Sequence, residues 1–261
     1  MAPEYSPADI PALISSLIAH GKTGNLRAVV QVLNQIEKLT KQQKNTPGSQ
    51  KLLAEAYRHA LEPFGVAQKF KEVEQFIEKI ENFLQNNSNS EALQETLGEA
   101  YSAAIFHYIK NSRKRGIHKN LKKLGEFACN HQNNPFVQLN YARSLSDTAE
   151  YFAEEEKEEF DMLIRLLKEM IGIVTFYPGK EILANVAPGL QKAIATAGHC
   201  LSLKELEDLA TRIDEFINFT TDFEIQQLLT ACQGKIFQDI AGKRMREGLR
   251  PDGKAPKNKY R

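Results

Sequence analysis

The chain has 261 residues, 42% of them hydrophobic and 26% charged, so it is long enough to bury a substantial apolar core. The formal net charge of +1 excludes a strong overall field that would attract nucleic acid or an anionic membrane. No apolar run approaches the roughly 20 residues that span a bilayer, so we expect no membrane association. Three scattered cysteines do not form a disulfide framework and predict a cytoplasmic protein: Cys129, Cys200 and Cys232.

Apolar residues recur at helical spacing along nearly the whole chain, and no sustained period-two alternation indicates strands. Early stripes run from Leu26 to Leu39 and from Phe70 to Phe83. Turn-forming compositions separate the stripes at 21–24, 45–48, 86–89, 133–135 and 177–179. Two later helix starts read as capping boxes, Ser202 with Glu205 and Thr221 with Glu224. The sequence therefore predicts an all-α protein.

A small residue followed by an apolar one recurs six times, with 40 to 45 residues between successive occurrences. The small residues are Ser16, Ala60, Ala104, Ser144, Gly189 and Ala231. A small side chain lets one helix approach its neighbour closely, and the large one beside it fills the remaining space. We therefore expect each of these pairs to lie at a helix contact in the first helix of a repeated unit.

The second helix of each unit repeats in the same register. Val29, Leu33, Ile36 and Leu39 shift by 44 residues onto Val73, Ile77, Ile80 and Phe83, and by 44 more onto Ile117, Leu121, Leu124 and Phe127. Later units fit less closely, at Ile164, Leu167 and Met170, then at Leu209, Ile213 and Phe216. The pattern predicts an α-solenoid of about five stacked antiparallel helix pairs plus a C-terminal helix, over residues 1–248. An irregular helical bundle with accidental internal similarity is the alternative, and a basic tail at 249–261 is predicted to be disordered.

The first helices resemble those of tetratricopeptide (TPR) repeats. The segment from Leu97 through Gly98 to Tyr101 matches the Leu-Gly-x-x-Tyr pattern of that family, and the segments ending at Tyr57 and Tyr141 are weaker versions. The resemblance covers residues 8–235, although the unit is about ten residues longer than the family's 34. Leu, Ile and Phe also replace the family's two alanines in the second helix, so we expect longer helices or longer connectors.

The resemblance implies that the first helices line a concave groove that holds a partner. The polar groove positions, by register with the motif, are Lys51, Glu55, Arg58, His59, Glu95, Glu99, Ser102 and Arg143. Their mixed charge suits a peptide with a defined charge pattern better than a uniform polyanion. We therefore predict a non-catalytic scaffold or adaptor that binds a protein or peptide segment.

A second interpretation uses the basic stretch from Lys110 to Lys123, which contains no acidic residue. Arg113, Lys114, Arg115 and Lys119, together with the basic tail, could bind nucleic acid through its phosphates. The stretch lacks the interleaved aromatic residues on which single strands stack. The acidic stretch 150–161 occupies the equivalent place one unit later, so mutual neutralisation of the two stretches is the alternative.

No motif indicates catalysis or a cofactor. The chain has no phosphate-binding glycine loop, no Gly-x-Ser-x-Gly and no His-Glu-x-x-His. The pairs Cys129 with His131 and His199 with Cys200 lack a second pair at metal-ligand spacing, so no metal is expected. The sequence predicts a protein that is not an enzyme, and it leaves the partner's identity and the oligomeric state open.

Overall fold

The computed structural model describes residues 9–43, 46–155, 160–177 and 179–246. Within these ranges the regular elements are eleven α-helices, and no residue is in a strand, so the predicted all-α class is confirmed. The helices are α1 (Ile10–Lys22), α2 (Leu26–Gln42), α3 (Pro47–Val66), α4 (Phe70–Asn86), α5 (Glu91–Lys110), α6 (Lys114–Asn130), α7 (Pro135–Glu155), α8 (Phe160–Phe176), α9 (Lys180–Cys200), α10 (Leu203–Phe219) and α11 (Phe223–Arg246). The predicted tail 249–261 lies outside the described residues.

From α2 to α10, a shorter helix alternates with a longer one. The even-numbered helices α2, α4, α6, α8 and α10 each have 17 residues. Of the odd-numbered helices, α3 and α5 have 20 residues, and α7 and α9 have 21. The links at 67–69, 87–90 and 111–113 are short. The length beyond a 34-residue unit therefore lies in longer helices and not in longer connectors.

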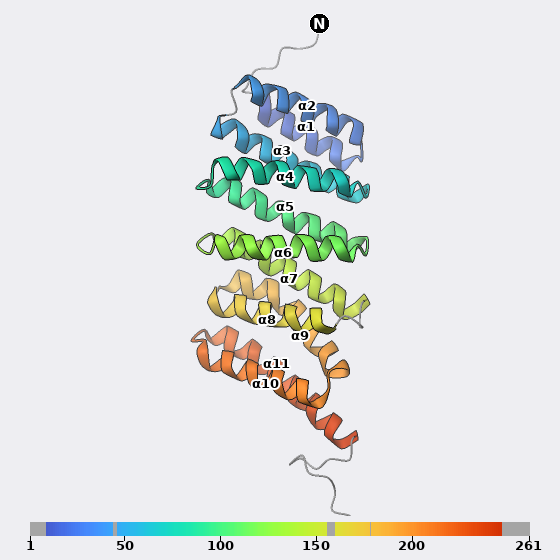
Figure 1. Ribbon diagram of the computed structural model, residues 1–261, viewed down its shortest axis with the longest axis vertical. Coiled ribbons are helices and arrows are strands. Elements are labelled where there is room, and N and C mark those ends of the chain that lie inside the picture. Colours follow the sequence, from blue (N-terminus) through green and yellow to red (C-terminus); the bar gives the residue numbers. More distant parts are fainter. Residues whose placement is uncertain (1–8, 44–45, 156–159, 178, 247–261) are drawn as a thin grey trace, which may run out of the picture. The chain divides into compact units, whose positions relative to one another are not determined.

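The helices form two compact units, unit 1 (Met1–Tyr141) and unit 2 (Ala142–Arg261). In unit 1, α3 packs against α1, α2, α4 and α5, while α5 also packs against α4 and α6 (Figure 1). In unit 2, α9 packs against α8 and α11, and α10 packs against α8 and α11. Each helix thus contacts near neighbours in the chain, a pattern compatible with a helical repeat.

The predicted repeat positions form much of the core. The apolar partner of each small residue is buried at all six positions: Leu17, Leu61, Ile105, Leu145, Leu190 and Cys232. The small residues Ala60, Ala104 and Ser144 are buried beside them, and a Cβ added to Gly189 would lie 2.6 Å from Ser146. Ser16 is only partly exposed, but Ala231 is exposed. The expected close contact at Ala231 is therefore wrong, because α11 is the last described helix and buries only the side that faces α9 and α10.

Three turns between a first and a second helix share one backbone geometry. A residue with positive φ occurs at Gly24 (69°), Gln68 (57°) and Ser112 (51°), at intervals of 44 residues. The following amide reaches back five residues, as in the bond from Lys69 N to Phe64 O at 2.8 Å. This is the Schellman ending of a helix, in which a left-handed residue lets two amides satisfy the last carbonyls. The same turn therefore directs each second helix of unit 1 back along the first.

One of the two predicted capping boxes is present. The Ser202 hydroxyl accepts a bond from Glu205 N at 3.3 Å, and the Glu205 carboxylate accepts one from Ser202 N at 2.8 Å. The box predicted at Thr221 is wrong, because α11 begins at Phe223. Asp222 caps it instead, accepting a bond from Ile225 N at 3.1 Å.

Candidate functional site

The polar positions predicted on the first helices lie on the uncovered side of α3 and α5 in unit 1. Lys51 and Glu99 are exposed. The others are partly exposed, and none is buried: Glu55, Arg58, His59, Glu95 and Ser102. Arg143 is an exposed residue of α7 in unit 2. The structure therefore brings seven of the eight predicted residues onto one pair of neighbouring helices, with Arg143 in the other unit.

Arg58 links this surface across the two helices. Its Nε lies 2.9 Å from Oε2 of Glu99 on α5, and its Nη2 donates to Nε2 of His59 at 2.7 Å. A guanidinium can only donate, so Nε2 of His59 carries a lone pair and the imidazole is neutral. Partial burial, and then the charge of Arg58, lower the pKa of His59 to about 4. The site thus holds a fixed ion pair beside a neutral imidazole.

In unit 2, Arg143 also links one first helix to the next. Its Nε donates to Oδ1 of Asn185 on α9 at 3.3 Å. Nδ2 of Asn185 in turn donates to the Glu181 carbonyl at 2.7 Å, which fixes the amide. Arg143 is therefore held by a neutral amide and keeps its charge available at the surface.

Several side chains of the basic stretch from Lys110 to Lys123 already make contacts within unit 1. Lys119 forms an ion pair with Glu74, and Lys123 pairs with Glu81 at 2.7 Å, both on α4. Arg113 lies over the Phe70 ring, 5.9 Å from its centroid. Arg115 is exposed. Of the acidic stretch, 156–159 lie outside the described residues, and Glu154 pairs with Lys192 of α9.

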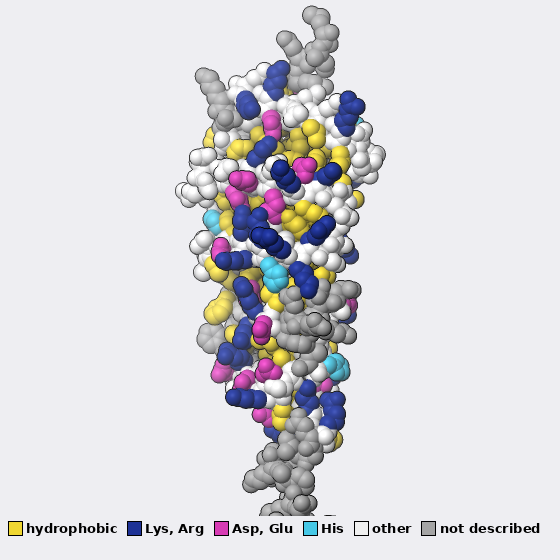
Figure 2. Space-filling model, turned by 45° about the vertical axis from the view of Figure 1, so that its right-hand side comes forward, with side chains coloured by type: hydrophobic (Ala, Val, Ile, Leu, Met, Phe, Trp, Pro, Cys, Tyr) yellow, Lys and Arg dark blue, Asp and Glu magenta, His cyan; other side chains and the backbone are white. Residues whose placement is uncertain are grey.

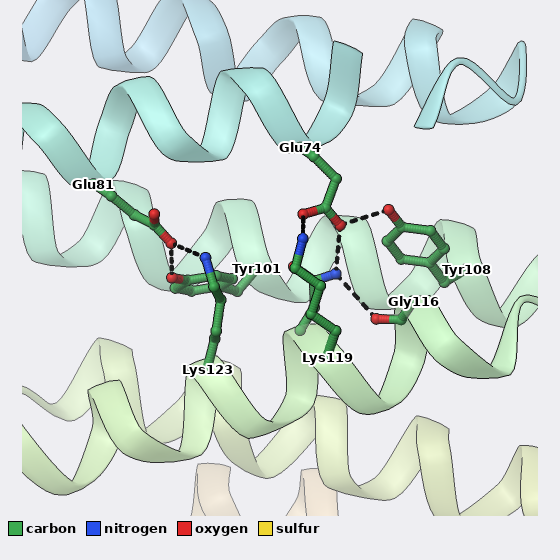
Figure 3. A network of polar contacts seen from close by, with 8 residues as sticks. Glu74, Glu81, Tyr101, Tyr108, Gly116, Lys119 and Lys123 are labelled. Atoms are coloured by element: carbon green, nitrogen blue, oxygen red, sulfur yellow. Dashed lines mark hydrogen bonds and ion pairs between the residues drawn. The ribbon is translucent and has the colours of Figure 1, made fainter. Parts of the chain in front are cut away.

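The lysine contacts belong to a four-residue arrangement that occurs twice, 44 residues apart. In the first copy Tyr57 donates to Glu37 at 2.6 Å, Lys79 bonds the same carboxylate at 2.8 Å, and Phe83 stacks on the Tyr57 ring. In the second copy Tyr101 and Lys123 bond Glu81 (Figure 3), and the Phe127 ring lies tilted against that of Tyr101. We call this arrangement the bracket. Each copy joins one second helix to both helices of the next pair, so it supports stacking and not partner binding.

The bracket has no third copy in unit 1. The place of its glutamate is taken by Gly125, 44 residues after Glu81. A Cβ added to Gly125 would lie 3.0 Å from the Tyr141 hydroxyl oxygen, so the ring of Tyr141 packs closely over this glycine. The Tyr141 ring thus packs over the position at which the first two copies have a carboxylate.

A second buried cluster surrounds Glu74 on α4. Tyr108 donates to its Oε1 at 2.6 Å, and Asn120, which is fully buried, donates at 2.9 Å (Figure 3). Partial burial alone would raise the pKa of Glu74, but hydrogen bonds led by that from Lys119 outweigh it and hold the pKa below its usual value. A Cβ on Gly116 would lie 2.2 Å from the Tyr108 ring, so only glycine admits this tyrosine.

Searches of protein-family models, curated proteins and solved structures find no match to this chain.

The structure adds one observation on metal binding and one on membrane-spanning helices. Among the described residues, no group of three or more His, Cys, Asp and Glu side chains could hold a metal ion. No helix in the described ranges is both long and apolar enough to cross a membrane.

Proposed function

We propose that the protein is a non-catalytic, cytoplasmic interaction scaffold whose stacked, TPR-like helix pairs present the uncovered face of α3 and α5 to a protein segment. The supporting observation is the Arg58–Glu99 ion pair beside neutral His59, which gives that face a fixed pattern of positive, negative and neutral groups. Such a pattern selects a segment by its sequence of charges.

The face is suited to this role because the helices beneath it are rigidly joined. Two brackets and three identical turns hold the helix pairs of unit 1 in register. A preorganised surface loses less conformational entropy when it binds. In unit 2 we assign a contact of the same kind to Arg143, which binds a separate segment of the partner.

Nucleic-acid binding through the basic stretch is the less supported function. Of the four residues predicted for it, Lys119 is engaged by Glu74, and Arg113 lies over Phe70. These two positive groups already make contacts within the protein, which leaves a weaker attraction for phosphates than the sequence suggests.

The test starts from a random dodecapeptide display library selected on the purified full-length protein. Affinities of the enriched peptides are then measured for wild type, for Arg58→Ala, and for a control in which Arg113, Lys114 and Arg115 are replaced by Ala. We expect Arg58→Ala to weaken binding about tenfold, the loss of one charged contact. The triple variant should bind the peptides as wild type does. Loss of binding in the triple variant alone would contradict the proposal.

A further inference from the structure

A cleft of about 670 Å³ opens at one end of unit 1, between the C-terminal ends of α1 and α3 and the turn that follows α1. Its apolar lining comes from Ile18, Leu26, Pro63, Val66 and Ala67. We call it the end cleft. Its volume is within the range of small-ligand sites and exceeds that of a single large side chain.

Several backbone amides in the helix endings that form the end cleft are already bonded within those endings. The amides of Gly24 and Asn25 bond the carbonyls of Gly21 and His20, and the amide of Ala67 bonds the Pro63 carbonyl. Glu62 is paired with His107 at 3.0 Å, and His59 is the neutral imidazole of the candidate site. What the cleft offers a ligand is therefore mainly apolar surface.

Two large apolar side chains remain exposed on the same first helices. Val66, in the cleft wall, is 68% exposed, and Phe106 on α5 is 42% exposed. Phe106 occupies the position 44 residues after Glu62, and Lys110 lies over its ring at 5.3 Å. Val66 thus adds exposed apolar surface to the cleft wall itself.

Two lysines lie at the helix ends that border the end cleft. Lys22 lines it, and Lys69 lies two residues beyond Ala67; neither forms an ion pair within the described residues. The single carboxylate in the lining, Glu62, contacts Nε2 of His107 at 3.0 Å, and its side chain is 68% exposed. Figure 2 shows one face of the protein, on which hydrophobic patches lie among Lys and Arg side chains and interspersed Asp and Glu side chains. At the end cleft two lysines stand against one carboxylate, so the border has a net positive charge around an apolar centre.

We propose that the end cleft binds one bulky apolar side chain of an acidic protein segment, with Lys22 and Lys69 contacting its carboxylates. The inference rests on the proposed function and names the segment's chemistry. Val66 and Pro63 contact the inserted side chain, and His59 joins the cleft to the Arg58–Glu99 pair on the adjoining face. A segment seated in the cleft therefore continues onto α3.

An acidic peptide fits these groups better than RNA does. Single-stranded RNA binders stack bases on exposed aromatic rings. Among the described residues, no aromatic side chain lines the end cleft. Apolar walls of aliphatic side chains instead match Leu, Ile, Met or Phe.

The test uses the same dodecapeptide library, selected on full-length wild type. We expect the enriched peptides to be net acidic and to share a bulky apolar residue. Val66→Glu should weaken them at least tenfold, since it places a carboxylate in the cleft wall. The matched control is Val30→Glu, because Val30 is a half-exposed valine of α2 outside the cleft, and it should leave affinity unchanged. Lys22→Glu should also weaken binding, and Lys38→Glu on α2 should not.

The outcomes separate the two proposals. If the peptides lose affinity with Arg58→Ala but not with Val66→Glu, the proposed function stands and the end-cleft inference is overturned. Enriched peptides that are basic or lack a bulky apolar residue would also overturn the inference. A 15-nucleotide oligouridine is the third probe. If it binds more tightly than the peptides and is weakened by Lys22→Glu, the end cleft serves RNA and both proposals fail. Thermal melts of every variant verify that the fold is intact.

Discussion

At the scale of single residues, one repeat position has different environments in the two units. Ala104 is fully buried in α5, whereas Ala231 at the same position of α11 is exposed. The difference arises because α5 has helices on both sides in the chain, while no described helix follows α11. The sequence pattern alone does not distinguish an interior repeat from a terminal one, since both keep a small residue.

Ala104→Leu should lower the free energy of unfolding by about 1–3 kcal/mol, because the added carbons have no space at this helix contact. Ala231→Leu is the matched control, and its effect should stay within about 0.5 kcal/mol, as for other exposed sites. Urea unfolding of both variants measures the difference. Equal destabilisation by the two substitutions would contradict the assigned contact.

His59 makes stability depend on pH. Its folded pKa of about 4 lies below its ordinary value of about 6.5, so the unfolded chain binds more protons between these two values. The contribution is complete above pH 6.5 and is lost as the pH falls towards 4. His59→Gln should therefore flatten the fall in unfolding free energy between pH 6.5 and 4, measured by urea titration. An unchanged slope would show that His59 titrates alike in both states.

At the scale of helices, the turns and close packings were the features least visible in the sequence. Helix positions followed from the 3.6-residue apolar spacing, and Gly24 marked one turn plainly. Gln68 and Ser112 occupy the same left-handed position without being glycine, because the Schellman bonds hold them there. The recurrence of Glu37 and Lys79 at Glu81 and Lys123 was a readable signal of the bracket. Only the fold shows which tyrosines those residues meet.

Gln68→Gly should raise the free energy of unfolding by roughly 0.5–1 kcal/mol. Glycine removes the steric cost of positive φ, and its greater freedom in the unfolded chain offsets part of the gain. Gln68→Ala keeps a Cβ and serves as the control, with no comparable gain. The melting temperatures of the two variants give the comparison. A loss of stability in Gln68→Gly would argue against the left-handed turn.

Two helix glycines should respond oppositely to alanine. Gly116→Ala should destabilise the protein by about 1–3 kcal/mol, because its Cβ would overlap the Tyr108 ring that bonds Glu74. Gly234→Ala should stabilise it by about 0.5–1 kcal/mol, since that position faces open space within α11. Chemical denaturation measures both. Stabilisation of Gly116→Ala would mean that Tyr108 does not cross α6 there.

At the scale of the whole molecule, the all-helical class and the period near 44 residues were predictable because they depend on many positions at once. The even helices begin at 26, 70, 114, 160 and 203, close to the spacing of the apolar stripes. The polar positions on α3 and α5 were named from the resemblance to TPR repeats; none of them is buried, and their role in binding stays a prediction. Its specific contacts were not, because Arg58 reaches Glu99 across 41 residues of sequence. The sequence did not predict the end cleft, because its walls come from a turn and from two helix ends that are distant in the chain.

Hydrogen exchange followed by mass spectrometry tests the central claim most directly, that the uncovered face of α3 and α5 receives a protein segment. The wild-type chain is compared with and without its tightest library-selected dodecapeptide. We predict slower exchange at 51–59 of α3 and 95–102 of α5, with no change at 113–119 of α6. Protection confined to 113–119, or none on α3 and α5 at a saturating peptide concentration, would contradict the account.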